Sequence, residues 1–395
     1  MSARARIART VFLSLIFATL TLSARAMPGD SCQCGDVNND RAIGVGDVVA
    51  FRAWLASPTG APFTPAGFDK CNVAGGNASA CNVLDLTVLR RGLESLGPGI
   101  APTCDAQYGT DGNLVRFAAF GAQGDGSAGQ LAVANALREV CLDRCCDFVQ
   151  LLGDNVLPNG VTSSADPQFA TKFETPYASV DLPFWAVLGN HDYGGSGAGN
   201  EFEKGPYQVE YSALSSAKFE LPALYWHRTV KHVHMLGLDS TKTLWSMDAA
   251  QRLEIDAWLN GSSATWQISA GMHCYRSNGA HGNAGCYDSD TCPNPLPVVN
   301  GATVKTFYES LVCGRVDLAL CAYDRNMQWL QDTCAGTELV VAGAGASVTL
   351  LEDVQPAWFE GEQLGFLYVE IDGNTLTAEF IDTAGNTLFA RTLTK

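Results

Sequence analysis

The sequence predicts an α/β protein, with one large domain of alternating strands and helices behind a small helical unit. Over residues 112–395, short apolar runs alternate with helical stretches, a pattern typical of βαβ units. Ahead of it, residues 27–103 contain an Asp- and Asn-rich loop followed by a short apolar helix. The segment Gly97–Pro102 is rich in Gly and Pro and marks a linker between the two units.

The elements of the large domain can be placed in order. Its first half predicts, in order, a strand, a helix and two strands: Val115–Phe120, Gln130–Cys141, Asp147–Leu152 and Phe184–Leu188. Polar motifs follow the apolar runs directly, at strand ends, where open α/β sheets place their sites. The tail from Leu339 to Leu393 turns to alternating strands such as Leu376–Phe380. We expect this tail to form a second sheet that completes a β-sandwich core flanked by helices.

The first 26 residues have the form of a secretory signal peptide. Three arginines precede an apolar run from Val11 to Leu22, and the small residues Ala24 and Ala26 provide a cleavage site. The run is shorter than the roughly 20 residues that a membrane-spanning helix needs. We therefore predict a secreted, periplasmic or extracellular protein without a membrane span.

The 14 cysteines are expected to form disulfides in an exported chain. Cys71 pairs plausibly with Cys81 across a tight turn, and Cys286 with the nearby Cys292. The adjacent Cys145 and Cys146 cannot easily pair with each other, so each is expected to need a distant partner. Zinc is the rival explanation, but no CxxC pairs with a second CxxC in the sequence.

The chain is strongly acidic, with a formal net charge of −16 at pH 7. The predicted signal peptide carries four arginines and no acidic residue, so its removal leaves a more negative protein. An acidic surface repels nucleic acid and anionic lipid, which excludes both as expected partners.

The leading unit contains a candidate calcium loop. Side-chain oxygens stand at loop positions 1, 3, 5 and 12, where the sequence has Asp36, Asn38, Asp40 and Asp47, and Ala42 can offer its carbonyl at position 7. This is the ligand spacing of an EF-hand, in which one short turn wraps a hard cation with oxygen atoms. The alternative is an Asp/Asn-rich turn that binds no metal.

This unit resembles the dockerin type I repeat, which also closes its loop with Asp. A second copy begins near Cys71 and ends at Asn82–Arg90, but it lacks most acidic ligands. In the first copy, Arg41 stands at a turn position usually given to Gly. The resemblance implies one Ca²⁺ ion in this module and a cohesin-like or cell-surface protein as its partner.

Five short segments of the large domain follow one another with family-specific spacing. They are FGAQG at 120–124, GDNVL at 153–157, GNHD at 189–192, GMH at 271–273 and AYDR at 322–325. Together they resemble calcineurin-like metallophosphoesterases, most closely the tartrate-resistant (purple) acid phosphatase branch, over about residues 114–395. In that family the segments read roughly GDxG, GDNxY, GNHD, GHH and GHDH. The resemblance implies a metallophosphoesterase β-sandwich and phosphomonoester hydrolysis at two metal ions.

The resemblance also implies which positions ligate the metals. Two of the seven ligands are present, Asp154 as the bridging carboxylate and Asn190. The other five positions are substituted and hold Ala122, Leu157, Met272, Tyr323 and Arg325. Ala and Leu offer no donor atom, a thioether suits hard ions poorly, and a guanidinium repels a cation. We therefore expect no dinuclear Fe/Zn site, with only weak residual binding at Asp154 and Asn190.

Other matched positions are intact. The resemblance implies that His191 and His281 contact the substrate and that Asp192 orients His191. Without metals these side chains could still bind an anion, or they persist because they are buried and bonded to one another. Arg325 suggests a further hypothesis, an ion pair with Asp154 that replaces the metal charge.

The sequence thus predicts a secreted acid-phosphatase-like protein that is catalytically impaired and serves in binding or as a scaffold, with a dockerin-like attachment module. An anionic ligand in the former metal cleft is one possible partner. The alternative is an active phosphomonoester hydrolase with a rearranged or single metal site. In a third interpretation, the leading module is the functional part and the large domain is its cargo.

Overall fold

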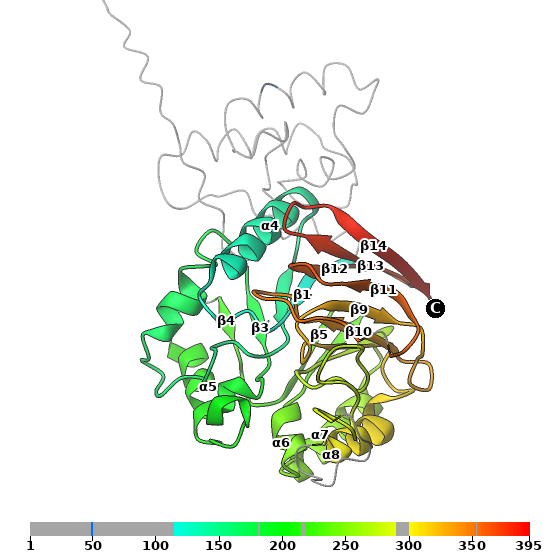
Figure 1. Cartoon of the computed structure of the whole chain (residues 1–395). Helices are drawn as coiled ribbons and strands as arrows, with labels where there is room; N and C mark the ends of the chain where they lie inside the picture. The colour runs from blue at the N-terminus through cyan, green and yellow to red at the C-terminus, as the bar shows by residue number, and fades with distance from the viewer. Residues whose placement is uncertain (1–48, 50–113, 181, 215–217, 290–299, 353) are drawn as a thin grey trace, which may run out of the picture.

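The computed structural model describes Val49 and residues 114–180, 182–214, 218–289, 300–352 and 354–395. Most of this region forms two seven-stranded sheets with helices around them (Figure 1). The signal peptide, the calcium loop, the dockerin-like repeats, the linker and Cys71, Cys81 and Cys292 lie outside the described residues. The predictions about them therefore stay predictions.

The first sheet has β1 at its centre. Its strands run in the order β14 (Thr387–Thr394), β13 (Thr375–Asp382), β12 (Gly365–Asp372), β1 (Leu114–Phe120), β2 (Phe148–Leu151), β3 (Phe184–Ala186) and β4 (Phe219–Glu220). The strands β1 to β4 are parallel, whereas β12 pairs antiparallel with β1. Parallel strands place their carboxyl ends at one edge, so the loops after β1, β2 and β3 can meet there.

The second sheet is also mixed. Its order is β11 (Ala357–Gly361), β9 (Met327–Leu330), β10 (Glu338–Ala342), β8 (Leu318–Cys321), β7 (Trp266–Ala270), β6 (Val233–Gly237) and β5 (Trp226–Val230). The inner strands β6, β7, β8 and β10 are parallel. Buried residues from both sheets form one hydrophobic cluster, so the predicted α/β architecture with a sandwich core is confirmed.

The prediction for the tail was wrong in one respect. Residues 339–393 do not make a second sheet of their own, because β10 and β11 join one sheet while β12, β13 and β14 extend the other. Strand β12 pairs with β1 along six residues, from Leu114 opposite Asp372 to Ala119 opposite Leu367. Alternating patterns fix which face of a strand is buried but not which sheet it joins.

The helices and turns lie around the sandwich. They are α4 (Ala128–Arg144), η2 (Ala170–Glu174), η3 (His191–Tyr193), η4 (Gly195–Gly197), α5 (Lys204–Leu214), α6 (Ser240–Leu244), α7 (Ala249–Gly261), α8 (Ala302–Phe307) and η5 (Tyr308–Val312). Figure 1 shows α6, α7 and α8 gathered beside the second sheet, whereas α4 lies by the first sheet near β12. Helix α4 contains the predicted helix Gln130–Cys141, and Ser127 caps it by accepting a hydrogen bond from Gln130 N.

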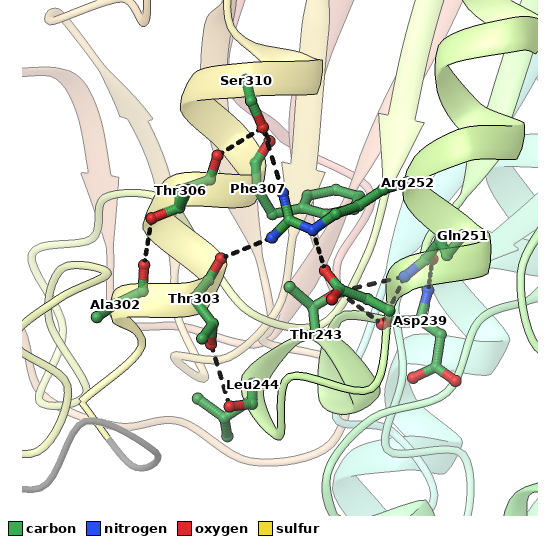
Figure 2. Close-up of polar contacts among 11 residues, drawn as sticks. Asp239, Thr243, Leu244, Gln251, Arg252, Ala302, Thr303, Thr306, Phe307 and Ser310 are labelled. Carbon is green, nitrogen blue, oxygen red and sulfur yellow. Dashed lines mark hydrogen bonds and ion pairs between the residues drawn. The ribbon is translucent and has the colours of Figure 1, made fainter.

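A polar network fixes the helices beside the second sheet (Figure 2). Gln251 on α7 accepts a hydrogen bond from Asp239 N and donates to Asp239 O and to Thr243 Oγ1. On the next position of α7, Arg252 pairs with Asp248 and donates to Thr303 O and Ser310 Oγ. The chain segment that leaves β6 at Asp239 is thereby anchored to α7 by a buried amide.

Three disulfides join described residues: Cys141–Cys146, Cys274–Cys321 and Cys313–Cys334. The expectation that Cys146 needs a distant partner was wrong, because the end of α4 brings Cys141 within 5.1 Å of it, Cα to Cα. Cys145 and Cys286 are disulfide-bonded as well. Along the part of the chain that is described, no helix is long and apolar enough to cross a membrane.

Candidate functional site

The loops that follow five parallel strands meet at one edge of the sandwich. The loop after β1 bonds to the loop after β2 through Ala122 N and Gly153 O, at 3.0 Å, and to the end of β10 through Gly121 N and Ala342 O, at 2.9 Å. The loops after β7 and β8 are joined through Ala322 N and Met272 O, at 3.1 Å. The segment GNHD joins the site through His191 N, which donates to Asp154 Oδ1 at 3.1 Å, so all five motif segments converge, as the family resemblance implies.

Two residues at this edge have a left-handed backbone. Ala122 has φ +53° and Asp154 has φ +58°, a conformation that costs an ordinary residue about 1 kcal/mol. The approach of the loops is also close, since a Cβ on Gly189 would lie 2.2 Å from Asp154 Oδ1. The strained backbone of the site is thus present even where the ligand side chain is absent.

Asp154 is buried at the centre of the site. Its Oδ1 accepts a hydrogen bond from His191 N at 3.1 Å, whereas Oδ2 has no hydrogen-bond partner among the described residues. Burial raises the pKa of this carboxyl, against the opposing charges of His191 and Arg325.

Asn190 presents a second unpartnered acceptor. Its Nδ2 donates to Gly197 O at 2.7 Å, while its buried Oδ1 meets no donor in the described part of the chain. Two oxygen atoms, Asp154 Oδ2 and Asn190 Oδ1, are therefore available to a cation, as the resemblance implies.

The remaining positions do not fit a dinuclear centre. Ala122, Leu157 and Met272 are buried, at 0%, 6% and 2% exposure, and fill the site with carbon and one thioether sulfur. Tyr323 is also buried, and burial foremost raises its pKa far above the ordinary value, so its hydroxyl stays protonated. Within the described ranges, no group of three or more His, Cys, Asp or Glu is arranged to hold a metal ion.

The polar residues beside the substituted positions make hydrogen bonds of their own, although His273 Nε2 and Asp324 Oδ2 are buried without a hydrogen-bond partner among the described residues. Asp125 Oδ1 accepts a hydrogen bond from Ser127 N at 2.8 Å, at the start of α4. His273 Nδ1 lies 2.9 Å from Ser240 Oγ, and Asp324 Oδ1 accepts from His281 N at 2.9 Å. Burial lowers the pKa of His273 to about 3, so the ring stays neutral. These three polar groups hold the loops together.

The expected ion pair between Arg325 and Asp154 is not formed. The guanidinium Nη1 of Arg325 donates to Ser347 Oγ at 3.3 Å, and the backbone N donates to Thr349 Oγ1 at 3.2 Å. Among described residues, Arg325 has no ion-pair partner within 4.0 Å. One hydroxyl group of the loop after β10, that of Ser347, accepts from the side chain, whose charge therefore acts on Asp154 only at longer range.

The ring of His191 is held by a backbone carbonyl and not by Asp192. Its Nδ1 lies 2.6 Å from Pro158 O. Asp192 is fully buried, and its two oxygens accept hydrogen bonds from Asn155 N, Val156 N, Gly189 N and Gln208 Nε2, at 2.8 to 3.1 Å. Asp192 therefore does not orient His191, although the resemblance implies that it does. It joins the loops after β2 and β3 to α5.

Burial raises the pKa of Asp192 to about 6, together with the nearby charge of Asp154. The N–H donors of Gly189, Gln208 and Asn155 oppose this shift because they favour the ionised carboxylate. Asp192 is therefore ionised above about pH 6.

His281 lies over a substituted ligand position, that of Tyr323. Its ring stacks on Tyr323, with centroids 4.0 Å apart and planes 20° apart, and its Nδ1 lies 2.6 Å from Asp288 Oδ1. Burial lowers the pKa of His281, but the hydrogen bond to Asp288 and the charge of Asp324 outweigh it and raise the pKa. The structure thus brings Asp154, Asn190, His191 and His281 to one site, while Asp192 lies beneath it.

Sequence reasoning missed Pro158 and Asp288, which hold the two histidine rings. Pro158 acts through a carbonyl that any residue carries, so no side-chain pattern could have identified it. Asp288 lies seven residues after His281 and Nδ1 of His281 reaches it, but only the folded loop shows that they meet.

The comparisons with known proteins agree with this geometry. No family model matches the chain. The chain is 26% identical over 321 residues to purple acid phosphatase 4 of Arabidopsis thaliana, covering 73% of this chain and 88% of that protein. It is also 26% identical over 318 residues to tartrate-resistant acid phosphatase type 5 of Sus scrofa, covering 70% and 86%.

Among solved structures, the chain is similar to the one described as GAP50, the anchor in the inner membrane complex of Plasmodium. The TM-score is 0.57 at 18% identity, over 71% of this chain and 89% of that chain. The fold is thus phosphoesterase-like, and the sequence is similar to those of purple acid phosphatases.

Proposed function

We propose that this chain is a secreted binding or scaffold protein built on an acid-phosphatase-like domain whose dinuclear metal centre has been lost. The observation that carries the proposal is the buried apolar filling at three ligand positions, Ala122, Leu157 and Met272. A buried side chain without a donor atom cannot ligate Fe³⁺ or Zn²⁺, and the charge of Arg325 further disfavours a cation.

The basic groups of the site can bind an anion. His191, His281 and Arg325 all act on Asp154 through their charges, while the carboxylates of Asp288 and Asp324 act on His281. The stacked ring of His281 and the backbone-held ring of His191 are already oriented, which lowers the entropic cost of binding.

A second candidate function is phosphomonoester hydrolysis at a single metal site. The free acceptors Asp154 Oδ2 and Asn190 Oδ1 favour it. One metal bound there would polarise a phosphoryl oxygen, while His191 could hydrogen-bond the leaving group.

The secreted full-length chain is expected to bind less than about 0.1 equivalent of Fe, Zn or Mn at the cleft and to lack phosphatase turnover, because too few donors surround the site. The measurement is elemental mass spectrometry after exposure to each metal, with p-nitrophenyl phosphate as substrate. Asp154→Asn serves as the control that separates cleft metal from metal elsewhere. The proposal would be refuted if the parent bound two equivalents of metal that Asp154→Asn does not bind, and if the parent hydrolysed the substrate.

Sulfate binding in the cleft is expected to be strong at acid pH and to weaken as the pH rises. The raised pKa of His281 keeps its positive charge above the ordinary value of about 6.5. The same group stabilises the fold below pH 6.5, and this contribution is lost as the pH rises through the folded-state pKa. Calorimetric titration with sulfate, whose charge is constant over this range, measures the dependence on the protein.

Asp288→Asn removes the carboxylate that raises the pKa, so the loss of sulfate binding should move to lower pH. The matched control is Asp332→Asn, at a surface ion pair with Arg276, and it should leave the profile in place. Sulfate affinity that is the same from pH 5 to pH 8 in all three proteins would argue against a binding role for His281.

The leading module completes the proposal. We infer that residues 1–26 direct export, that Asp36, Asn38, Asp40, Ala42 and Asp47 bind one Ca²⁺, and that the folded module attaches the chain to a cohesin-like or cell-surface protein. The three disulfides of the described domain are compatible with an extracellular location. A pull-down with the leading module alone as bait tests the attachment. The same module with Asp36→Ala, which is expected not to bind Ca²⁺, is the control.

A further inference from the structure

Two histidines on neighbouring strands form a pair outside the phosphatase-like cleft. His227 on the edge strand β5 and His234 on β6 approach to 3.1 Å, between Nδ1 of the first and Nε2 of the second. His234 lies opposite Gln267 near the start of β7, whereas the cleft residue Met272 follows the end of that strand. Five residues of extended strand separate the two levels by about 16 Å.

The hydrogen bonds assign the protons in this pair. Gln267 Oε1 lies 3.2 Å from His234 Nδ1 and can only accept, so Nδ1 carries the proton. The Nε2 of neutral His234 is then a lone-pair nitrogen and accepts from Nδ1–H of His227. A buried imidazole nitrogen is therefore presented to an exposed imidazole ring.

The spacing of the two nitrogens suits a single metal ion. With metal–nitrogen distances of about 2.0–2.1 Å, two ligands at 90° to 109° lie about 2.9–3.4 Å apart. The observed 3.1 Å falls in this interval. The chain needs only a rotation of the exposed His227 ring to direct both lone pairs at one point.

The surroundings orient the buried His234 ring and place the His227 ring beside an indole. A metal-bound histidine usually donates its other N–H to a carbonyl, as His234 does to Gln267. His227 stacks on Trp258 of α7, with centroids 4.3 Å apart and planes 17° apart. Burial lowers the pKa of both histidines, which keeps them neutral and able to ligate near neutral pH.

We propose that His227 Nδ1 and His234 Nε2 together bind one divalent transition ion such as Zn²⁺ or Cu²⁺, with water completing the coordination. The ion takes the place of the shared proton, which moves from Nδ1 to Nε2 of the same His227 ring. Bound ion would tie the edge strand β5 to β6 and stabilise the folded state through mass action.

The test is calorimetric titration of the full-length chain with Zn²⁺ at pH 7.5, in excess Ca²⁺ to fill the leading module. We expect one equivalent of Zn²⁺ that is lost in His227→Gln, a variant at an exposed position that leaves the core intact. His232→Gln, at the turn between the same two strands, is the matched control and should keep the full equivalent. Gln267→Met should weaken binding about tenfold, because it removes the orienting acceptor.

Copper supplies a second readout. Cu²⁺ quenches nearby indoles, so its addition should reduce tryptophan fluorescence in the parent, and Trp258→Phe should bind Cu²⁺ but show less quenching. Equal Zn²⁺ affinity and stoichiometry in the parent and in His227→Gln would overturn the inference. If the Zn²⁺ equivalent were lost in Asp154→Asn and kept in His227→Gln, the ion would be bound in the cleft. That outcome would contradict this inference, and it would also contradict the proposed loss of metal binding in the cleft.

Discussion

Restoring the five substituted ligands is expected to return metal binding to the cleft. In the variant Ala122→Asp, Leu157→Tyr, Met272→His, Tyr323→His and Arg325→His, the metal bound in the cleft should rise from less than about 0.1 to near two equivalents of Fe or Zn, in addition to any ion at His227 and His234. The backbone that positions these residues is in place, since Ala122 and Asp154 keep their left-handed conformations and the loops remain bonded to one another.

The restored variant should be less stable than the parent without metal, because it buries a carboxylate and polar rings that lack partners. Metal should then raise its melting temperature by more than it raises that of the parent, in which only the pair of His227 and His234 binds an ion. The measurements are elemental analysis and thermal unfolding with and without metal. The same variant with Asp154→Asn is the control, since it lacks the bridging carboxylate. A folded restored variant that still binds no metal would show that the site has changed beyond its ligand identities.

Asp192→Asn is expected to destabilise the domain by about 3 kcal/mol or more at pH 7.5. The two oxygens of Asp192 accept four hydrogen bonds from the loops after β2 and β3 and from α5. An amide keeps one oxygen and turns its NH₂ toward two of these donors, which are left buried and unsatisfied. Urea unfolding followed by circular dichroism measures the loss.

Asp125→Asn is the matched control for this prediction. Asp125 Oδ1 accepts a single hydrogen bond from Ser127 N. An asparagine oxygen can accept the same bond, so the free energy of unfolding should change by less than about 0.5 kcal/mol. If Asp192→Asn were as stable as Asp125→Asn, the buried carboxylate would not be what holds these loops.

Much of the fold could be predicted because the spacing of apolar residues along the sequence indicates strands and helices. The runs Val115–Phe120 and Asp147–Leu152 became β1 and β2, and Gln130–Cys141 lies inside α4. The pairing of the tail could not be predicted, since β12 must find β1 across some 250 residues and nothing in its own pattern names that partner.

The candidate site divides in a similar way. Motif spacing identified Asp154, Asn190, His191 and His281, and the folded chain brings them together. The partners of these side chains were not readable: Pro158 instead of Asp192 holds His191, and Ser347 instead of Asp154 accepts from Arg325. A hydrogen bond goes to whichever group lies within about 3 Å, which depends on loop conformation and not on residue type.

The sequence by itself determined which of the matched positions lack a suitable donor atom, because the identity of a side chain decides whether it has one. Ala122, Leu157 and Met272 have no suitable donor in any fold. Only the tertiary structure decided which polar atoms remain unpartnered and which histidines meet, as Asp154 Oδ2 and the pair of His227 and His234 show. Those properties depend on which side-chain atoms lie within about 3 Å of one another, and the packing of the folded chain sets those distances.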